Sequence, residues 1–329
     1  MVCNQRSELG GTVLDGKYRV EGPIGYGGTA VVFGAERLMD GHPVAIKMLK
    51  REYAHYPDLI RRLHWEADVA YHVGHPGLVR TLDDGELADS SPYVVVERVH
   101  GESLCRLIKR VVALEWRAAC AVARRVSGVL HAVHRAGYVH RDLKPEHIWL
   151  HRAEDGGLGV RLLDFGVCQP PEQDPAQVKR DRGRVFGTPG YVAPEQAAAE
   201  APVDARADLY SLGATLYEML TGRAPFRGRN VAVLLRRAIE EDAPPLRRML
   251  PSAPIEVARL VDALLARNAD ARPMNARVAE RALLLQMEDV GAVEQALASR
   301  LMPTADAPPS SQTVDHVAQT RQVSLADAL

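Results

Sequence analysis

Acidic and basic side chains suited to catalysis gather in two short stretches of this 329-residue chain. Residues 140–147 read His-Arg-Asp-Leu-Lys-Pro-Glu-His, which places a carboxylate, Asp142, two positions before an amine, Lys144. A second carboxylate, Asp164, begins Asp-Phe-Gly directly after the apolar strand predicted over residues 160–163. A carboxylate at the end of such a strand can hold a magnesium ion that bridges phosphate groups.

A glycine cluster stands much earlier in the chain. Residues 24–32 read Ile-Gly-Tyr-Gly-Gly-Thr-Ala-Val-Val, which follows the pattern G-x-G-x-x-x-x-V with Ala30 in place of a third glycine. Small residues let the backbone of a hairpin lie close to nucleotide phosphates. A plain glycine-rich turn is an alternative. A dinucleotide-binding fingerprint is a rival interpretation, but the residues that follow predict a strand rather than a helix.

A lysine and a glutamate follow, one at the end of a predicted strand and one inside a predicted helix. Val-Ala-Ile-Lys, residues 44–47, predicts a strand that ends in Lys47, and Glu66 lies inside a helix predicted over residues 59–73. Only six of the 41 Lys and Arg residues are lysines, so chance seldom places one in a motif. Taken singly, each residue also fits a lysine at a strand edge or a solvated helix glutamate.

The elements that must position these residues change character near Gly101. Short strands are predicted before it, around the helix at 59–73, over residues 18–20, 30–33, 44–48, 78–82 and 93–99. Helices are predicted after it, over residues 104–110, 116–136, 208–220, 230–240 and 255–265. The pattern indicates a small β-rich lobe, a larger helical lobe and a ligand cleft between them.

Five or more motifs therefore occur in a fixed order, and together they resemble a eukaryotic-like Ser/Thr protein kinase of the kind common in bacteria. The resemblance covers about Tyr18 to Leu285 and implies an α+β, two-lobed protein-kinase fold. Its motifs are the glycine-rich loop, V-A-I-K, the helix glutamate, H-R-D, D-F-G and A-P-E at residues 193–195. Residues 143–146 and Gly187-Thr188 follow the Ser/Thr form rather than the Tyr form.

The resemblance assigns catalytic roles. Asp142 would orient the substrate hydroxyl and accept its proton, and Lys144 would stabilise charge on the transferred phosphoryl group. Lys47, fixed by Glu66, would hold the ATP phosphates, and Asp164 would bind Mg²⁺.

The resemblance also assigns binding and structural roles. Backbone groups of Glu97 and Val99 would meet adenine, and the other nucleotide-binding residues would be Ile24, Gly25, Gly27, Val32, Ala45, Lys47 and Trp149. Asp208 resembles a buried helix aspartate that braces the catalytic loop, and Arg272 resembles the arginine that pairs with the A-P-E glutamate, Glu195.

His147 is the main departure from the family pattern, because an asparagine that binds the second metal is expected there. Imidazole nitrogen is a poor ligand for Mg²⁺ and suits Mn²⁺ or softer ions better. The metal set expected from the sequence is thus Asp164 with His147, and the second site is weakened. The alternative is a tolerated exchange in which His147 bonds to Asp142 or to backbone.

Trp149 is a second departure, at a position where a medium aliphatic residue under adenine is usual. Its indole could stack on the base, crowd it out, or turn toward the helical core. Val96, at the back of the nucleotide pocket, is small and makes room for it.

The activation segment is a third departure, because residues 167–185 contain no Ser, Thr or Tyr that could be phosphorylated. The segment instead carries Lys179, Arg180, Arg182 and Arg184, which fit a solvated face or a docking site for an acidic partner. The C-terminal tail has Thr304, Ser310, Ser311, Thr313, Thr320 and Ser324, which could be phosphorylated.

Composition excludes several classes of partner and location. A net charge of −1 predicts no nucleic-acid partner, no apolar run is long enough to span a membrane, and four scattered cysteines indicate a reduced, cytoplasmic protein. We expect a loose leader at 1–15, a kinase domain at 16–285 with its lobes divided at 100/101, a helical extension at 286–301 and a disordered tail at 302–329.

Two functions follow. The first is a Ser/Thr kinase that uses ATP and Mg²⁺, or Mn²⁺, to phosphorylate protein substrates. The alternative is a pseudokinase that acts as a nucleotide-binding scaffold or regulator. A homodimer formed through the small lobe is a further alternative, which no residue of the sequence demonstrates.

Overall fold

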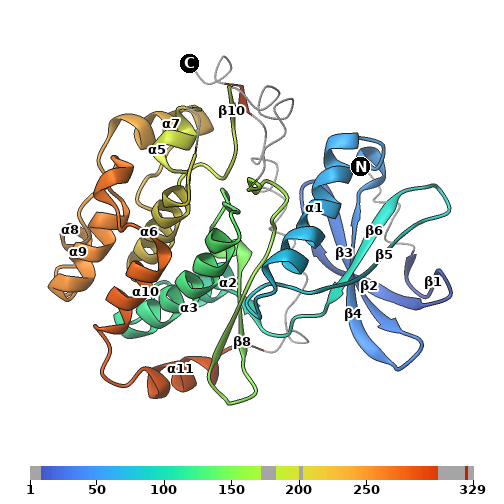
Figure 1. The fold of residues 1–329 in the computed structure, drawn as a ribbon. Coiled ribbons are helices and arrows are strands. Elements are labelled where there is room, and N and C mark those ends of the chain that lie inside the picture. Colours follow the sequence, from blue (N-terminus) through green and yellow to red (C-terminus); the bar gives the residue numbers. More distant parts are fainter. Residues whose placement is uncertain (1–8, 172–182, 200–202, 303–322, 325–329) are drawn as a thin grey trace. The chain divides into compact units, whose positions relative to one another are not determined.

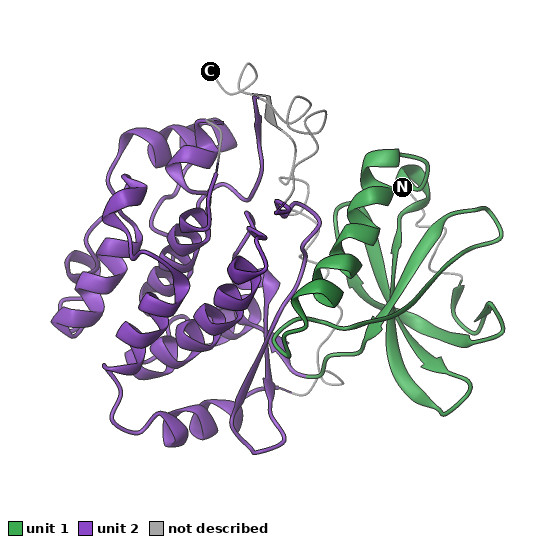
Figure 2. Ribbon diagram, in the orientation of Figure 1, with its two compact units in different colours: residues 1–100, 304–318 green, residues 101–303, 319–329 purple. Residues whose placement is uncertain are grey.

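The computed structural model describes residues 9–171, 183–199, 203–302 and 323–324. They form two compact units: unit 1 holds residues 9–100, and unit 2 holds residues 101–302 with 323–324 (Figure 2). Unit 1 is built mainly from strands and unit 2 mainly from helices, which gives the α+β content expected from the sequence (Figure 1).

Unit 1 contains one antiparallel sheet of six strands in the order β1-β2-β3-β4-β6-β5. The strands are β1 Val13–Leu14, β2 Tyr18–Tyr26, β3 Ala30–Arg37, β4 His42–Leu49, β5 Thr81–Glu86 and β6 Pro92–Glu97. A short 3-10 helix, η2 Arg51–Tyr53, precedes helix α1 Pro57–Val73, which ends at Gly74 in the left-handed conformation. Gly74 suits this end because glycine adopts a positive φ without steric cost.

The two faces of this sheet have different partners, because successive side chains of a strand point to opposite faces. On β4, Val44, Ile46 and Met48 enter one buried cluster together with Phe33 and Tyr93. Residues on the other face of the sheet, which include Ala30, Leu49 and Val94, pack with Leu63 of α1. Lys47 alternates with Ile46 and Met48, so the strand period places it on the face that α1 covers.

Unit 2 is largely helical. Its helices are α2 Leu104–Val111, α3 Trp116–Arg135, α5 Pro194–Ala197, α6 Arg206–Thr221, α7 Val231–Glu240, α8 Leu246–Met249, α9 Ile255–Leu264, α10 Ala276–Leu284 and α11 Val290–Ala298, with 3-10 turns η3 Pro145–His147 and η4 Ala269–Ala271. Helix α6 is buried along nearly its whole length, so it forms the centre of the unit. Asn230 and Asn275 accept backbone hydrogen bonds at the starts of α7 and α10, which is the ordinary capping role of asparagine.

Short strands complete unit 2. β7 Glu102–Ser103, β8 Ile148–Arg152 and β9 Leu158–Leu162 form a three-stranded sheet. β10 Arg184–Val185 pairs with β11 Val323–Ser324. The segment that contains Asp142 lies between α3 and η3 in the chain, and β8 follows η3 directly.

Several elements differ from the sequence predictions. The expected strand at 78–82 starts too early: β5 begins at Thr81, and the buried Leu78 is a single bridge residue that follows the turn at 76–77. β6 ends at Glu97, before the predicted end at Val99. Val13–Leu14 of the expected leader pairs with β2, while residues 1–8 and most of the expected tail lie outside the described residues.

Candidate catalytic site

Lys47 and Glu66 lie together in unit 1. The Lys47 amine forms an ion pair with the Glu66 carboxylate of α1, and each side chain is about a quarter exposed, at 24%. The sheet explains the contact, because the face of β4 that carries Lys47 is the face against which α1 packs. The helix glutamate predicted from the sequence is therefore within bonding distance of the predicted lysine.

Residues predicted to bind the nucleotide lie beside Lys47. Val32 is directly opposite Lys47 in the β3–β4 register and opposite Gly25 in the β2–β3 register. Ala45 lies two residues before Lys47 on the same strand and therefore on the same face. The structure thus brings Gly25, Val32, Ala45 and Lys47 to one face of the sheet.

The glycine-rich segment forms the hairpin between β2 and β3. The backbone N–H of Gly27 donates to the carbonyl of Ala30 at 2.8 Å, and Lys50 donates to the carbonyl of Gly28 at 2.8 Å. A Cβ on Gly27 would lie 3.2 Å from the Ala30 oxygen, so glycine suits this tight turn. Strand β3 follows the turn, as expected from the sequence, and no helix starts there as a dinucleotide fingerprint would require.

The other residues predicted to contact adenine lie on different elements of the two units. Ile24 is on β2 and 39% exposed, Glu97 ends β6 and accepts a hydrogen bond from the Arg80 backbone at 3.2 Å, and Val99 follows without regular structure. Trp149 belongs to unit 2, on β8. Its neighbours Ile148 and Leu150 are fully buried, so the alternation of the strand places Trp149 on the opposite face from that core.

The catalytic segment of unit 2 is anchored by Asp208 of α6. The fully buried Asp208 carboxylate accepts hydrogen bonds from the backbone N–H groups of His140 and Arg141, both at 2.8 Å, and lies 2.7 Å from Nε2 of His134. Burial alone would raise the pKa of Asp208, but the His134 hydrogen bond and charge, the His140 charge and the His140 backbone donor outweigh it, so the pKa is lowered. An ionised Asp208 therefore holds the loop, which is the bracing role that the resemblance implied. The sequence analysis did not single out His134.

Asp142, Lys144 and Thr188 form a closely bonded set in unit 2. The Thr188 hydroxyl donates to Asp142 Oδ1 at 2.7 Å, and the Lys144 amine donates to the Thr188 oxygen at 2.6 Å and to Asp142 Oδ2 at 3.2 Å. Asp142 and Lys144 are each only 4% exposed. The structure therefore brings the predicted base and the predicted phosphoryl-stabilising lysine together, and it shows Asp142 accepting a hydrogen bond from a hydroxyl group.

His147 lies between the carboxylates of Asp142 and Asp164. Its Nδ1 is 2.8 Å from the backbone oxygen of Asp142, and its Nε2 is 3.3 Å from Oδ2 of Asp164. A carbonyl oxygen can only accept, so Nδ1 carries the proton in this contact. The bond to backbone is the one that the tolerated-exchange alternative described, and the contact with Asp164 was not predicted.

Asp164 follows β9 in a strained position. The backbone N–H of Leu163 donates to the His147 carbonyl at 2.9 Å, and Asp164 itself has a φ of +64°. Phe165 is buried, with its ring centroid 4.6 Å from that of His140. Positive φ in a non-glycine residue costs free energy and recurs at functional sites, so packing of Phe165 holds the half-exposed Asp164 carboxylate in place.

Asp164 offers one carboxylate to a divalent cation. A single Mg²⁺ commonly takes one or two carboxylates and completes its shell with phosphate oxygens and water. The neighbouring side chain here is an imidazole rather than a second oxygen donor. Among the described residues, no group of three or more His, Cys, Asp or Glu side chains is arranged to hold a metal by itself.

The second structural pair is also formed. Arg272 donates from Nη1 and Nη2 to the two oxygens of Glu195 at 2.7 and 2.8 Å, in the two-pronged geometry that guanidinium and carboxylate favour. Gln196, the next residue, was not predicted to matter. Its amide donates to the backbone oxygens of Arg141 at 3.0 Å and Phe186 at 3.2 Å, and so joins the catalytic segment to the activation segment.

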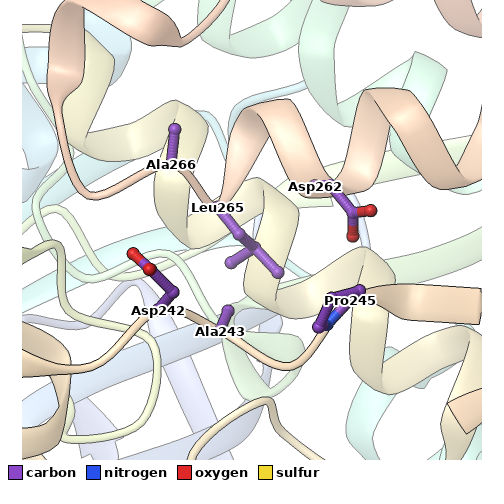
Figure 3. A pocket seen from close by; sticks show the side chains of 6 residues that line it. All are labelled: Asp242, Ala243, Pro245, Asp262, Leu265 and Ala266. Atoms are coloured by element: carbon purple, nitrogen blue, oxygen red, sulfur yellow. The ribbon is translucent and has the colours of Figure 1, made fainter. Parts of the chain in front are cut away.

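A separate cavity lies elsewhere in unit 2. It has a volume of about 180 Å³, and Figure 3 shows its lining of Asp242, Ala243, Pro245, Asp262, Leu265 and Ala266. None of these side chains belongs to the catalytic set, and one of them, Asp262, is engaged by the Leu246 backbone. The cavity therefore contributes nothing to the site described above.

Comparison with known proteins agrees with this geometry. Residues 18–284 match the family model described as protein kinase domain. The chain belongs to the protein kinase family. Its relatives place it among the bacterial, eukaryotic-like Ser/Thr kinases, so the resemblance expected from the motifs and the α+β kinase fold are confirmed.

Three of these kinases show how far the similarity extends. A probable serine/threonine-protein kinase of Corynebacterium efficiens is 34% identical over 86% of this chain and 43% of its own length. The kinase pkn2 of Myxococcus xanthus is 36% identical over 92% of this chain and 36% of its own length. PknA of Mycobacterium tuberculosis is 34% identical over 78% of this chain and 58% of its own length. The alignments thus cover between about a third and three fifths of these relatives. Within the described residues, no helix is long and apolar enough to cross a membrane.

Proposed function

We propose that this chain is a Ser/Thr protein kinase that transfers the γ-phosphoryl group of ATP to a hydroxyl group of a protein substrate. The observation that carries the proposal is the bonded set of Asp142, Lys144 and Thr188. It places an acceptor for a hydroxyl proton and a positive charge within 3.2 Å of each other. The names of the bacterial relatives support the same reaction.

Each residue of the site has a role in this proposal. Asp142 orients the substrate hydroxyl and accepts its proton, and the Lys144 amine stabilises the charge on the phosphoryl oxygens. Lys47, held by Glu66, binds the ATP phosphates. Asp164 holds a divalent ion, which supplies charge neutralisation when it is bound.

We further propose that ATP binds with its phosphates near Gly25 and Gly27. Ile24, Val32 and Ala45 would contact the base, Glu97 and Val99 would offer it backbone groups, and Trp149 is the residue of unit 2 expected to contact the base. The location of Trp149 opposite the helical core supports contact with the base over a role in that core. A cytoplasmic location and a homodimer remain predictions from the sequence and the family.

His147 leads to a more specific proposal: phosphoryl transfer relies mainly on one metal ion, held by Asp164, and the second metal site is weak. Its Nε2 lies 3.3 Å from the Asp164 carboxylate, where an asparagine oxygen would serve a second ion. We expect weak activity with Mg²⁺ and better activity with Mn²⁺, because Mn²⁺ accepts nitrogen ligands more readily.

Radiolabelled phosphoryl transfer with each metal tests this proposal. His147→Asn should raise the Mg²⁺-supported rate by about tenfold, the lower end of the effect of residues that support metal ligands. His151→Asn is the matched control, since His151 contacts Arg161 and the Arg152 backbone rather than Asp164, and it should change nothing. Asp142→Asn should abolish transfer, and wild-type protein that transfers no phosphate with either metal would refute the kinase assignment.

The second candidate function is a pseudokinase that binds nucleotide as a scaffold or regulator. The observation in its favour is the same contact of His147 with Asp164, because a protein group already lies beside the metal-binding carboxylate. A thermal-shift titration separates the two. ATP that stabilises a protein without transferase activity supports the pseudokinase, and stabilisation that appears only in Trp149→Leu shows that the indole blocks the base.

A further inference from the structure

Arg141 lies at the junction of the catalytic segment and the activation segment. Its φ is +65°, a conformation that costs free energy in a residue other than glycine and persists only where the surrounding structure fixes it. The Arg141 backbone N–H donates to Asp208 at 2.8 Å, and its backbone oxygen accepts from the Gln196 amide at 3.0 Å. That oxygen belongs to the peptide group that joins Arg141 to Asp142. Both peptide groups around the strained residue are therefore held by side chains from other elements.

Gln196 makes this contact from a buried position, at 3% exposed. Its Nε2 donates to the Phe186 oxygen at 3.2 Å as well as to the Arg141 oxygen, and its Oε1 accepts from the Ala193 N–H at 3.4 Å. Both polar atoms of the amide therefore have backbone partners. Turning the amide over would set oxygen against oxygen, so these partners hold it in one orientation.

The Arg141 side chain is bonded to the first residues of the activation segment. Its Nε donates to the Val167 oxygen at 2.7 Å, and its Nη2 donates to the Cys168 oxygen at 3.3 Å. The next residue, Gln169, exchanges two backbone hydrogen bonds with Val139, at 2.8 and 3.0 Å. The start of the activation segment is thus joined to the catalytic segment by both side-chain and backbone hydrogen bonds.

Phe186, directly after the activation segment, contacts the same arginine. The Arg141 guanidinium lies 4.7 Å from the centre of the Phe186 ring, which is a cation–π contact. The Gln196 amide binds the backbone oxygens of both residues. Arg141 therefore contacts the chain at both ends of the segment, and Gln196 fixes its contact at the second end.

These contacts stand where a phosphate acts in many switched kinases. There, phosphorylation orders the activation segment because an arginine binds the new phosphate. Residues 167–185 of this chain contain no hydroxyl side chain that could carry one. The next hydroxyl residue, Thr188, is bonded to Asp142 and Lys144. The partners of the Arg141 side chain here include two backbone oxygens and an aromatic ring.

We propose that Gln196 is a positioning residue for Asp142, and that with Arg141 and Phe186 it holds the activation segment ready for phosphoryl transfer without a phosphate on that segment. This inference rests on the proposed kinase function. Gln196 acts through the peptide group that precedes Asp142. It therefore affects the rate of transfer rather than the binding of ATP.

Kinetics of matched glutamine variants test the positioning role, with casein as the protein substrate. Gln196→Glu keeps the shape of the side chain but removes its N–H donors, and Gln196→Met removes them without adding a charge. Both should lower kcat about tenfold, equivalent to about 1.4 kcal/mol, and leave KM for ATP unchanged. The same changes at Gln286, whose amide donates to the Ala282 oxygen, should alter neither constant.

A merely structural role for Gln196 predicts a different result. Its variants would then melt at a lower temperature while the kcat of the folded protein stayed equal to that of the wild type, and this outcome would overturn the proposal. Hydrogen exchange adds a readout that needs no catalysis. The amides of residues 167–169 should exchange about tenfold faster in Gln196→Met than in the wild type or in Gln286→Met. Equal exchange in the three proteins would show that Gln196 does not hold the segment, and would also overturn the proposal.

Treatment with a Ser/Thr phosphatase tests whether the segment works without a phosphate. Wild-type protein that has been dephosphorylated and freed from the phosphatase should phosphorylate casein at an unchanged initial rate and without a lag. A rate about tenfold lower that recovers during incubation with ATP would overturn the phosphate-free arrangement. Wild-type protein that transfers no phosphate to casein or to itself, before or after treatment, would instead refute the kinase function, and the exchange measurement would still decide whether Gln196 holds the segment.

Discussion

Asp208→Asn is the substitution that best tests how the catalytic loop is held. The Asp208 carboxylate is fully buried and accepts from the backbone N–H groups of His140 and Arg141 while it contacts His134. Asparagine keeps the size of the side chain but has only one acceptor oxygen. Either the Arg141 N–H, or the His140 N–H together with His134, then faces an NH₂ group.

The cost follows from these contacts. Hydrogen bonds to a buried charged group contribute about 1.5–3 kcal/mol each, and a buried donor left without a partner costs about 1–3 kcal/mol. We therefore expect Asp208→Asn to lower the free energy of unfolding by about 3–5 kcal/mol, as for other broken buried charge pairs. Phosphoryl transfer should fall as well, because His140 and Arg141 precede Asp142.

Urea unfolding of the wild type and the variant measures this difference. Asp262→Asn is the matched control, because exposed Asp262 also accepts a backbone hydrogen bond, from Leu246 at 2.9 Å, yet should cost no more than about 1 kcal/mol. A loss below 1 kcal/mol in Asp208→Asn, or a loss equal to that of the control, would refute the bracing role.

The pH dependence gives the same test a second readout. The pKa of Asp208 is lower in the folded chain than the usual value of about 3.9 for an unfolded aspartate. Its stabilising contribution is therefore complete above the unfolded pKa and is lost as the pH falls through the lower folded pKa. The difference between wild type and Asp208→Asn should shrink as the pH falls below about pH 4.

Three further predictions concern the helical unit. Glu294→Ala should lower the free energy of unfolding by about 3–5 kcal/mol in urea titrations, because it leaves Arg124 and Arg125 without the buried carboxylate that they share; a loss under 1 kcal/mol would show that α11 is dispensable. Asn275→Ala should cost about 1 kcal/mol, since its side chain caps α10, and Asn275→Asp should not. Burial, followed by the charge of a nearby glutamate, raises the pKa of the Cys105 thiol to about 12, so iodoacetamide at pH 8 should label it about a thousandfold more slowly than an unfolded control; equal labelling would contradict that environment.

Residue patterns within short segments were enough to predict much of the fold. Strand alternation around Lys47 and helical spacing around Glu66 were enough to predict both elements. The strand start at Leu78 was wrong, because a single buried residue after a turn cannot be told from the first residue of a buried strand by its apolar pattern.

Contacts between distant residues were beyond this reasoning unless a family motif supplied them. The Asp208 and Arg272 contacts were inferred from the resemblance, and the structure shows both. His134 and Gln196 were missed, because neither residue type nor spacing indicates that His134 contacts a side chain 74 residues away or that Gln196 bonds to a backbone oxygen 55 residues away. The contact of His147 with Asp164 was missed for the same reason.

The sequence by itself determined the residue types at each catalytic position and the order of the motifs, because these are properties of the chain read along its length. It also determined that an imidazole replaces an amide at position 147. Only the tertiary structure decided what that imidazole touches, which oxygen of Asp142 meets the Thr188 hydroxyl, and which residue lies opposite Arg184. Those facts depend on distances of a few ångströms between residues that lie far apart in the chain, and only the packing of the folded protein sets such distances.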